Sequence, residues 1–388
     1  MTVTTPLAAA ASPTPTARKG DNKRLNPSTP SVSVARRIAF EILRRVEGGS
    51  YASELLDSET RGMTSRDADL TFEIVFGVLR RRAQLDYLIR HYAGKGGRTY
   101  FEVRIALRIG LYQIHFLDRI PAHAAVPESV ELAKFAKGRF AAGFANAILR
   151  KAKPGPVAWP DRPTRLSMPE WLLDRWDRKY GGAATDRIAA AFLEKPEKYF
   201  TEDRQQDISS QSIVPLLGLE RGQTFLDVCA APGNKTLQAI GYGVHAIACD
   251  LHHHRIKQVE GCPRVQLDAT QPLPFDWKFD RILVDAPCSG TGTIGRNPEI
   301  RWRIKPEDLE DLRRRQTLIL RNSLAALAPG GVLVYSTCSL EPEEGEDVVH
   351  AVIGEMAKGK VSTSKIKTLR RTPGTDPGDG FFAAVISS

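Results

Sequence analysis

From about Gln206 onward the sequence alternates short β-rich apolar runs with helical stretches, and this alternation constrains the fold more than any other feature. The apolar runs are Phe225–Cys229, His245–Cys249, Val265–Leu267, Arg281–Val284, Val332–Ser336 and Phe381–Ile386. The clearest helical stretch between them is Pro306–Ala328. Strands separated by helices predict a doubly wound α/β domain with right-handed crossovers. We expect residues 206–388 to form this domain, with Phe381–Ile386 closing the sheet.

The N-terminal part of the sequence follows a different pattern, with apolar residues at helical spacing and no strand signal. One stripe comprises Val34, Ile38, Ile42 and Val46, and similar stripes continue to Ile148. Glycine pairs and prolines interrupt the pattern at intervals that suit helix ends. We therefore expect an all-α domain of five to seven helices over residues 35–155. A proline-rich linker and further helices should fill residues 156–205.

Many positions of this helical domain that we expect to be exposed carry arginine. They are Arg80, Arg81, Arg82, Arg90, Arg98, Arg104 and Arg108. The whole chain has 55 Lys+Arg against 45 Asp+Glu, a net charge of +10 and a pI near 9.4. Such a surplus favours a polyanionic partner, with nucleic acid as the default, although solubility alone would explain the charge equally well. The number of arginines favours an RNA-facing surface over a merely solvated one.

The sequence gives little sign of a targeting signal, a membrane span or a disulfide framework. Residues 1–34 are mostly Thr, Pro, Ala and Ser without the apolar core of a signal peptide, so we expect a disordered tail. No stretch approaches the roughly 18 apolar residues of a membrane span. The five cysteines are odd in number and form no C-x-x-C pair. That usage argues against structural disulfides or zinc and indicates a cytoplasmic protein.

Two of the cysteines follow apolar runs at points where strands should end. Cys288 comes shortly after Arg281–Val284, and Cys338 comes just after Val332–Ser336. Because the carboxyl ends of parallel strands share one edge of a sheet, where ligands bind, we expect the two thiols to meet there. They are candidate nucleophiles. The remaining cysteines, at 229, 249 and 262, we expect to be small buried hydrophobic residues.

The loop after the first predicted strand lacks both common phosphate-binding fingerprints, the P-loop and the dinucleotide G-x-G-x-x-G. It offers a turn of small residues that permits close approach of a ligand. Aspartates end the next three predicted strands, and a nucleoside-type cofactor with a positive charge, S-adenosylmethionine, would suit them. Each aspartate alone would more simply cap a turn. The expected cofactor contacts are Cys229, Ala230, Ala231, Pro232, Gly233, Asn234, Lys235, Asp250, Asp268 and Asp285.

Three consecutive histidines, His252–His254, invite a metal interpretation. Adjacent side chains at a helix start seldom share one face, so we expect a solvated or RNA-adjacent cluster and no metal site.

Three blocks of the C-terminal half resemble signatures of the RNA 5-methylcytosine methyltransferases. They are Asp227–Thr236, Asp285–Gly292, and Ser336–Leu340 with Pro342–Glu344; Arg296–Trp302 also has the look of that family. The helical domain is similar to the NusB-like RNA-binding domain fused to one branch, the bacterial small-subunit ribosomal RNA methyltransferases of the B type. The resemblance implies a Rossmann-like, S-adenosylmethionine-dependent domain with a mostly parallel sheet and an antiparallel final strand, acting as a monomer.

The resemblance also implies roles for four side chains. Carbon 5 of cytosine becomes nucleophilic once a thiolate has added at carbon 6, so the reaction needs a reactive cysteine and groups that move protons. By position alone either cysteine could attack. By resemblance Cys338 attacks and Cys288 helps to release the product. Asp285 would lie against the edge of the base, and Lys235 would support the pocket electrostatically.

The sequence departs from the family pattern at two places, and only the first leaves the substrate open, because Gly233 remains next to the second. The small RNA-binding subdomain that family members carry before the catalytic domain has little room between Phe192 and Gln211. Asn234 stands where a glycine is expected next to Lys235. We expect small-subunit ribosomal RNA as the substrate, with tRNA as the alternative. A catalytically inactive RNA-binding ribosome-assembly factor is the third interpretation, although Cys338 and Asp285 are both present.

Overall fold

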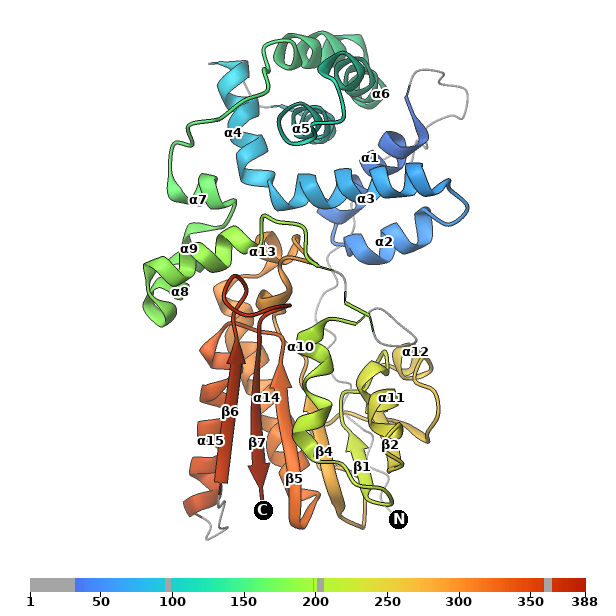
Figure 1. Ribbon diagram of the computed structural model, residues 1–388, viewed down its shortest axis with the longest axis vertical. Coiled ribbons are helices and arrows are strands. Elements are labelled where there is room, and N and C mark those ends of the chain that lie inside the picture. The colour runs from blue at the N-terminus through green and yellow to red at the C-terminus, as the bar shows by residue number, and fades with distance from the viewer. Residues whose placement is uncertain (1–31, 95–98, 198, 201–205, 359–364) are drawn as a thin grey trace, which may run out of the picture.

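The computed structural model describes residues 32–94, 99–197, 199–200, 206–358 and 365–388. A helical half is stacked on an α/β half, and strands β1, β4 and β5 point toward the helical half (Figure 1). The predicted N-terminal tail, residues 1–34, lies almost entirely outside the described residues. Within the described ranges no helix is both long and apolar enough to cross a membrane.

The described residues of the helical half form six helices, of which α5 is the central one. They are α1 (Val34–Glu47), α2 (Ala52–Glu59), α3 (Ser65–Arg80), α4 (Arg82–Ala93), α5 (Phe101–Phe116) and α6 (Ala122–Leu149). Helix α5 is buried on nearly all sides, and α1, α3, α4 and α6 surround it (Figure 1). Close packing needs a glycine in α3, because a Cβ at Gly77 would lie 1.9 Å from the Tyr112 ring. Helix α6 is kinked at Lys137–Gly138, where Gly138 has a φ of 77°.

A second group of helices joins the two halves. It consists of α7 (Arg162–Leu166), α8 (Glu170–Tyr180) and α9 (Gly182–Ala191). Their apolar side chains, Trp176 and Phe192 among them, form one buried cluster with Ile294 and Leu340 of the α/β half. Between α9 and the first strand, the described residues form only the short α10 (Ile208–Gln211) and the 3₁₀ turn η1 (Val214–Leu217).

The α/β half contains a seven-stranded sheet with the order β3-β2-β1-β4-β5-β7-β6. The strands are β1 (Thr224–Asp227), β2 (His245–Asp250), β3 (Arg264–Gln266), β4 (Phe279–Asp285), β5 (Leu327–Thr337), β6 (Lys365–Arg371) and β7 (Phe381–Ser387). Strands β1 to β5 are parallel to one another, and β7 runs antiparallel to β5. The predicted fold class, a mostly parallel sheet with an antiparallel final strand, is confirmed.

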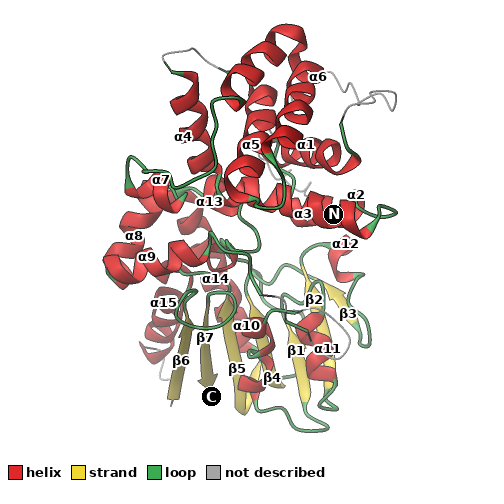
Figure 2. Cartoon of the chain, turned by 45° about the horizontal axis from the view of Figure 1, so that its top comes forward, coloured by secondary structure: helices red, strands yellow, loops and turns green. Residues whose placement is uncertain are grey.

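The α/β half also contains helices α11 (Asn234–Ile240), α12 (His253–Ile256), α13 (Ile300–Arg303), α14 (Pro306–Ala325) and α15 (Glu346–Lys358), with 3₁₀ turns η2 (Thr291–Thr293) and η3 (Pro342–Glu344). Helix α13 does not cover the sheet but lies beyond it, toward the helical half (Figure 2). Strand β6 was not predicted. It lies at the edge of the sheet, pairs only with β7 among the described strands, and has a basic sequence whose Ile366 and Leu369 are 37% and 38% exposed.

The expectation that the listed arginines face solvent is wrong for two of them. Arg108 is 3% exposed and forms ion pairs of 2.7 Å with both Glu47 and Asp86. Arg80 is 6% exposed, and its Nε donates to the carbonyl of Gly295 in the α/β half. A guanidinium is tolerated inside a protein when partners of this kind satisfy it. Of the others, Arg90 is exposed, Arg81, Arg82 and Arg104 are half-buried, and Arg98 lies outside the described residues.

Candidate active site

The two cysteines predicted to meet are in contact. Strands β4 and β5 are parallel neighbours in which Asp285 pairs with Ser336, so the loops that follow them start side by side. Cys288 Sγ lies 3.1 Å from Cys338 Sγ, and both side chains are half-buried and free of disulfides. The arrangement places two thiols at one point on the carboxyl edge of the sheet.

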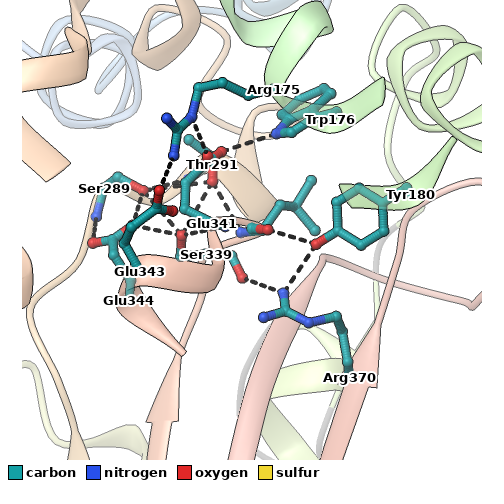
Figure 3. Close-up of polar contacts among 11 residues, drawn as sticks. Arg175, Trp176, Tyr180, Ser289, Thr291, Ser339, Glu341, Glu343, Glu344 and Arg370 are labelled. Carbon is teal, nitrogen blue, oxygen red and sulfur yellow. Dashed lines mark hydrogen bonds and ion pairs between the residues drawn. The ribbon is translucent and has the colours of Figure 1, made fainter. Parts of the chain in front are cut away.

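One buried carboxylate fixes both cysteine loops. Glu344 is 0% exposed and accepts hydrogen bonds from Ser289 N at 2.8 Å, from Ser289 Oγ and from Ser339 Oγ at 2.5 Å (Figure 3). Gln316 of α14 donates to Glu344 at 3.0 Å and to the carbonyl of Pro287 at 2.8 Å. Since Ser289 and Ser339 each follow a cysteine directly, Glu344 sets the separation of the thiols. The sequence marked Pro342–Glu344 as part of a block but assigned it no role.

The neighbouring glutamates tie the same turn to helix α8. Glu341, 1% exposed, accepts from Trp176 Nε1 at 2.9 Å and from Arg175 Nε at 3.0 Å. Arg175 also reaches Glu343 at 2.6 Å (Figure 3). The loop after Cys338 is thereby anchored on two sides, by α14 and by α8.

A lysine–aspartate pair lies on the same edge. Lys235 Nζ donates to Asp285 Oδ2 at 2.6 Å, and Ser336 Oγ donates to Asp285 Oδ1 at 2.7 Å. Burial alone would lower the pKa of Lys235, but the negative charges of Asp285, Cys338 and Asp227 outweigh it and raise that pKa above its ordinary value. Lys235 is therefore held as a cation, close enough to Cys338 for the two groups to interact electrostatically.

The two thiols differ in their surroundings. The hydrogen bond with Cys338, followed by burial and by the negative charges of Cys338 and Glu344, raises the pKa of Cys288 well above its ordinary value. Cys288 is consequently held as a protonated thiol. Burial likewise raises the pKa of the other three cysteines, Cys229, Cys249 and Cys262.

The loop after β1 offers a close-packed backbone for a cofactor. Gly233 has a φ of 110°, and a Cβ there would lie 3.2 Å from the Val259 backbone, so only glycine fits. Ala230 and Ala231 are buried beside it, Pro232 follows a cis peptide bond, and Asn234 and Lys235 begin α11.

Two carboxylates near this loop keep acceptor oxygens available. Asp250 lies at the end of β2, and its Oδ1 accepts a hydrogen bond of 2.9 Å from the backbone N–H of His252. Asp227, at the end of β1, accepts from Thr236 Oγ1 at 2.7 Å, while its buried Oδ1 has no partner among the described groups. Acceptors of this kind fit the ribose hydroxyls and the cationic methionine part of S-adenosylmethionine. The sequence did not single out Asp227 as a contact, although it ends an apolar run as Asp250 does.

Other predicted residues lie apart from this edge or stay within their own turns. Asp268 is exposed, and its Oδ1 accepts from the backbone and hydroxyl of Thr270 at 3.0 and 2.7 Å, as a turn cap does. His252, His253 and His254 are exposed. No group of three or more potential metal-ligating His, Cys, Asp or Glu side chains occurs among the described residues.

Comparisons with known proteins match both halves of this chain. The model of the 16S rRNA methyltransferase RsmB/F family matches residues 214–387, and that of the NusB family matches residues 33–154. The probable ribosomal RNA small subunit methyltransferase B of Bacillus subtilis is 30% identical over 82% of this chain and 88% of its own. The ribosomal RNA small subunit methyltransferase B of Cronobacter sakazakii is 30% identical over 91% of this chain and 98% of its own.

Among solved structures, that of PH0851 shares the fold with a TM-score of 0.72, covering 92% of this chain and 100% of its own at 19% identity. The alignment with the Cronobacter sakazakii protein extends over 431 positions against 388 residues here, so part of that relative has no counterpart in this chain. S-adenosylmethionine, the cofactor expected from the sequence, is the methyl donor of the matched family. With two family models and relatives of this identity spanning most of its length, the chain belongs to the RsmB/F family of methyltransferases.

Proposed function

We propose that this methyltransferase modifies carbon 5 of cytosine in small-subunit ribosomal RNA, through a covalent bond between Cys338 and the base. The observation that carries the proposal is the contact of two thiols, 3.1 Å apart, beside the Lys235–Asp285 pair. Cytosine-5 transfer needs one sulfur to add to the ring and a second group to assist its release. The names of the relatives support the choice of RNA, and the NusB-like half would supply binding to it.

In the proposed first step Cys338 Sγ, as the thiolate, bonds to carbon 6 of cytosine. The ring loses its aromaticity, nitrogen 3 takes up a proton, and carbon 5 becomes nucleophilic. Lys235 stabilises the attacking thiolate and, through its hydrogen bond with Asp285, holds a proton at the edge of the base. When bound, S-adenosylmethionine supplies the methyl group as a sulfonium substituent.

Before the proposed last step Cys288 releases its own proton to solvent and becomes a thiolate. It then removes the proton from carbon 5 while the bond between Cys338 Sγ and carbon 6 breaks, and nitrogen 3 returns its proton to the Lys235–Asp285 pair. The leading causes that raise the pKa of Cys288 include its hydrogen bond and charge interaction with Cys338. Both are lost once Cys338 Sγ is bonded to carbon, because the sulfur then has no negative charge. Attack by Cys338 therefore lowers the pKa of Cys288 and prepares it as a base.

The test is to incubate the protein with radiolabelled S-adenosylmethionine and, separately, unmodified 16S rRNA, the assembled small subunit and tRNA. We expect label in 5-methylcytidine from small-subunit RNA or its particle, and none with Cys338→Ala. Label only in tRNA would establish the alternative substrate. RNA binding without label in any cytosine would favour the inactive assembly factor.

A further inference from the structure

The segment Glu299–Arg303, which we call the α13 latch, lies between the two halves of the molecule (Figures 1 and 2). At its centre is Arg301, 0% exposed. Its Nη1 donates to the carbonyls of Ser167 at 3.0 Å and Arg80 at 3.3 Å, and its Nη2 donates to that of Phe192 at 3.1 Å. Burial and the charge of Arg80 lower the pKa of Arg301 to about 9. Burying a cation costs free energy unless partners satisfy it, and here three carbonyls from three separate segments do so.

The flanking residues of the α13 latch hold the helical half directly. Glu299, 2% exposed, accepts the backbone N–H of Ala52 at the start of α2 at 2.9 Å. Arg303 Nη2 donates to the carbonyls of Val46 at 2.6 Å and Ser50 at 2.5 Å. The Arg82 guanidinium lies 5.3 Å from the ring centre of Trp302. These contacts close the turn between α1 and α2 onto the α/β half.

The same segment touches the loops that carry the cysteines. Ile300 is partly buried and packs against the buried cluster that contains Ile294 and Leu340. Leu340 comes two residues after Cys338. A Cβ at Gly290, two residues after Cys288, would lie 3.0 Å from Ile300 Cδ1. The N–H of Gly292 donates to the carbonyl of Cys338 at 3.0 Å. The α13 latch is therefore in contact both with the helical half and with the surroundings of the two thiols.

We propose that the α13 latch fixes the helical half at one position over the edge of the sheet that carries Cys288 and Cys338, and that Arg301 is its positioning residue for presenting RNA. This inference rests on the proposed function, because it assumes an RNA that contacts both halves at once. When such an RNA has bound one half, binding to the second half costs little additional entropy only if the two surfaces are already held at the correct separation. A loosened latch would weaken RNA binding while leaving the cofactor loop and the thiols in place.

The test uses the full chain with Arg301→Met, with Arg303→Met as a second, less buried variant, and with Arg314→Met as the matched control. Arg314 is 71% exposed and, among the described residues, forms an ion pair only with Asp311 of its own helix. We expect KM for RNA to rise about tenfold in both latch variants, with kcat and S-adenosylmethionine affinity close to wild type. Hydrogen exchange at the Ala52 amide should also accelerate. Arg314→Met should behave as wild type in all four measurements.

Two outcomes would overturn the inference. One is an unchanged KM in the folded latch variants; the other is a parallel fall of kcat and cofactor affinity, which a purely structural role would produce. If Arg301→Met does not fold, Arg303→Met decides. If the wild-type protein methylates no RNA, the proposed function fails separately, and unchanged exchange at Ala52 would then reject the latch itself.

Discussion

Cys288 Sγ and Cys338 Sγ are 3.1 Å apart at the ends of neighbouring strands, with no disulfide between them. The proximity is directly testable. The thiol oxidant diamide should take up the two electrons and two protons of this pair and leave one Cys288–Cys338 disulfide. Peptide mass spectrometry would identify it, and methylation should stop until a reductant is added. Cys338→Ser should form no such crosslink. Failure of the folded wild-type protein to form the Cys288–Cys338 disulfide would contradict this geometry.

The two cysteines should fail in different ways when replaced. Cys338→Ala removes the attacking sulfur, so neither methylated RNA nor a covalent adduct should form. Cys288→Ala leaves attack and methyl transfer possible but hinders removal of the carbon 5 proton. A protein–RNA adduct that resists denaturation should therefore accumulate with S-adenosylmethionine, as seen on a denaturing gel. Adducts with Cys338→Ala but not with Cys288→Ala would mean that the roles are reversed.

Replacement of Gly233 tests the cofactor loop. Gly233→Val places a branched side chain at a φ of 110° with a Cβ contact of 3.2 Å to Val259, so the loop must shift. We expect S-adenosylmethionine binding to be lost, by about 100-fold or more, while the protein still folds and RNA binding changes little. Calorimetry with the cofactor measures the first quantity. A folded variant with wild-type affinity would show that the cofactor does not approach this turn.

The local sequence pattern was enough to predict the parallel strands and the edge of the sheet at which the candidate catalytic residues lie. The apolar runs located the parallel strands. Because ligands bind at the carboxyl ends of such strands, the sequence also predicted that Cys288, Cys338, Lys235 and Asp285 would lie at one edge of the sheet, as they do. Strand β6 was not predicted because it lies at the edge of the sheet with one solvated face, and its sequence is basic and only weakly apolar.

What sequence could not supply was the identity of long-range partners. Arg108 is buried only because Glu47 and Asp86, 61 and 22 residues away, both face it. The role of Glu344 depends equally on Ser289, 55 residues earlier, which no local pattern connects to it. Asp268 and Asp250 both end predicted strands and both accept from the backbone N–H two residues on, but Asp268 is exposed and Asp250 is buried, a difference that the strand pattern does not predict.

The buried Asp227 predicts a pH dependence of stability. Burial raises its pKa from 3.8 to about 7, so the folded state binds more protons than the unfolded state between these values. Stability should therefore fall as pH rises from about 4 to about 7, by at most about 4 kcal/mol from this group. Asp227→Asn keeps an acceptor for Thr236 and should flatten that part of the curve. Thermal midpoints at pH 5 and 7.5 measure the change; an equal slope in both proteins would refute it.

Removal of the charge on Glu344 should disturb the thiols without touching the cofactor loop. In Glu344→Gln one carboxylate oxygen is replaced by an NH₂ group, which faces the donors of Ser289 and Ser339 and must displace them. Because errors of about 1 Å in the placement of reacting groups cost about 100-fold in rate, we expect kcat to fall by that order. S-adenosylmethionine affinity should stay within about twofold, since its loop has separate contacts. Glu343→Gln is the matched control, because Glu343 is half-exposed and contacts Arg175 rather than the cysteine loops. Equal activity in the two variants would show that the carboxylate of Glu344 does not set the distance between Cys288 and Cys338.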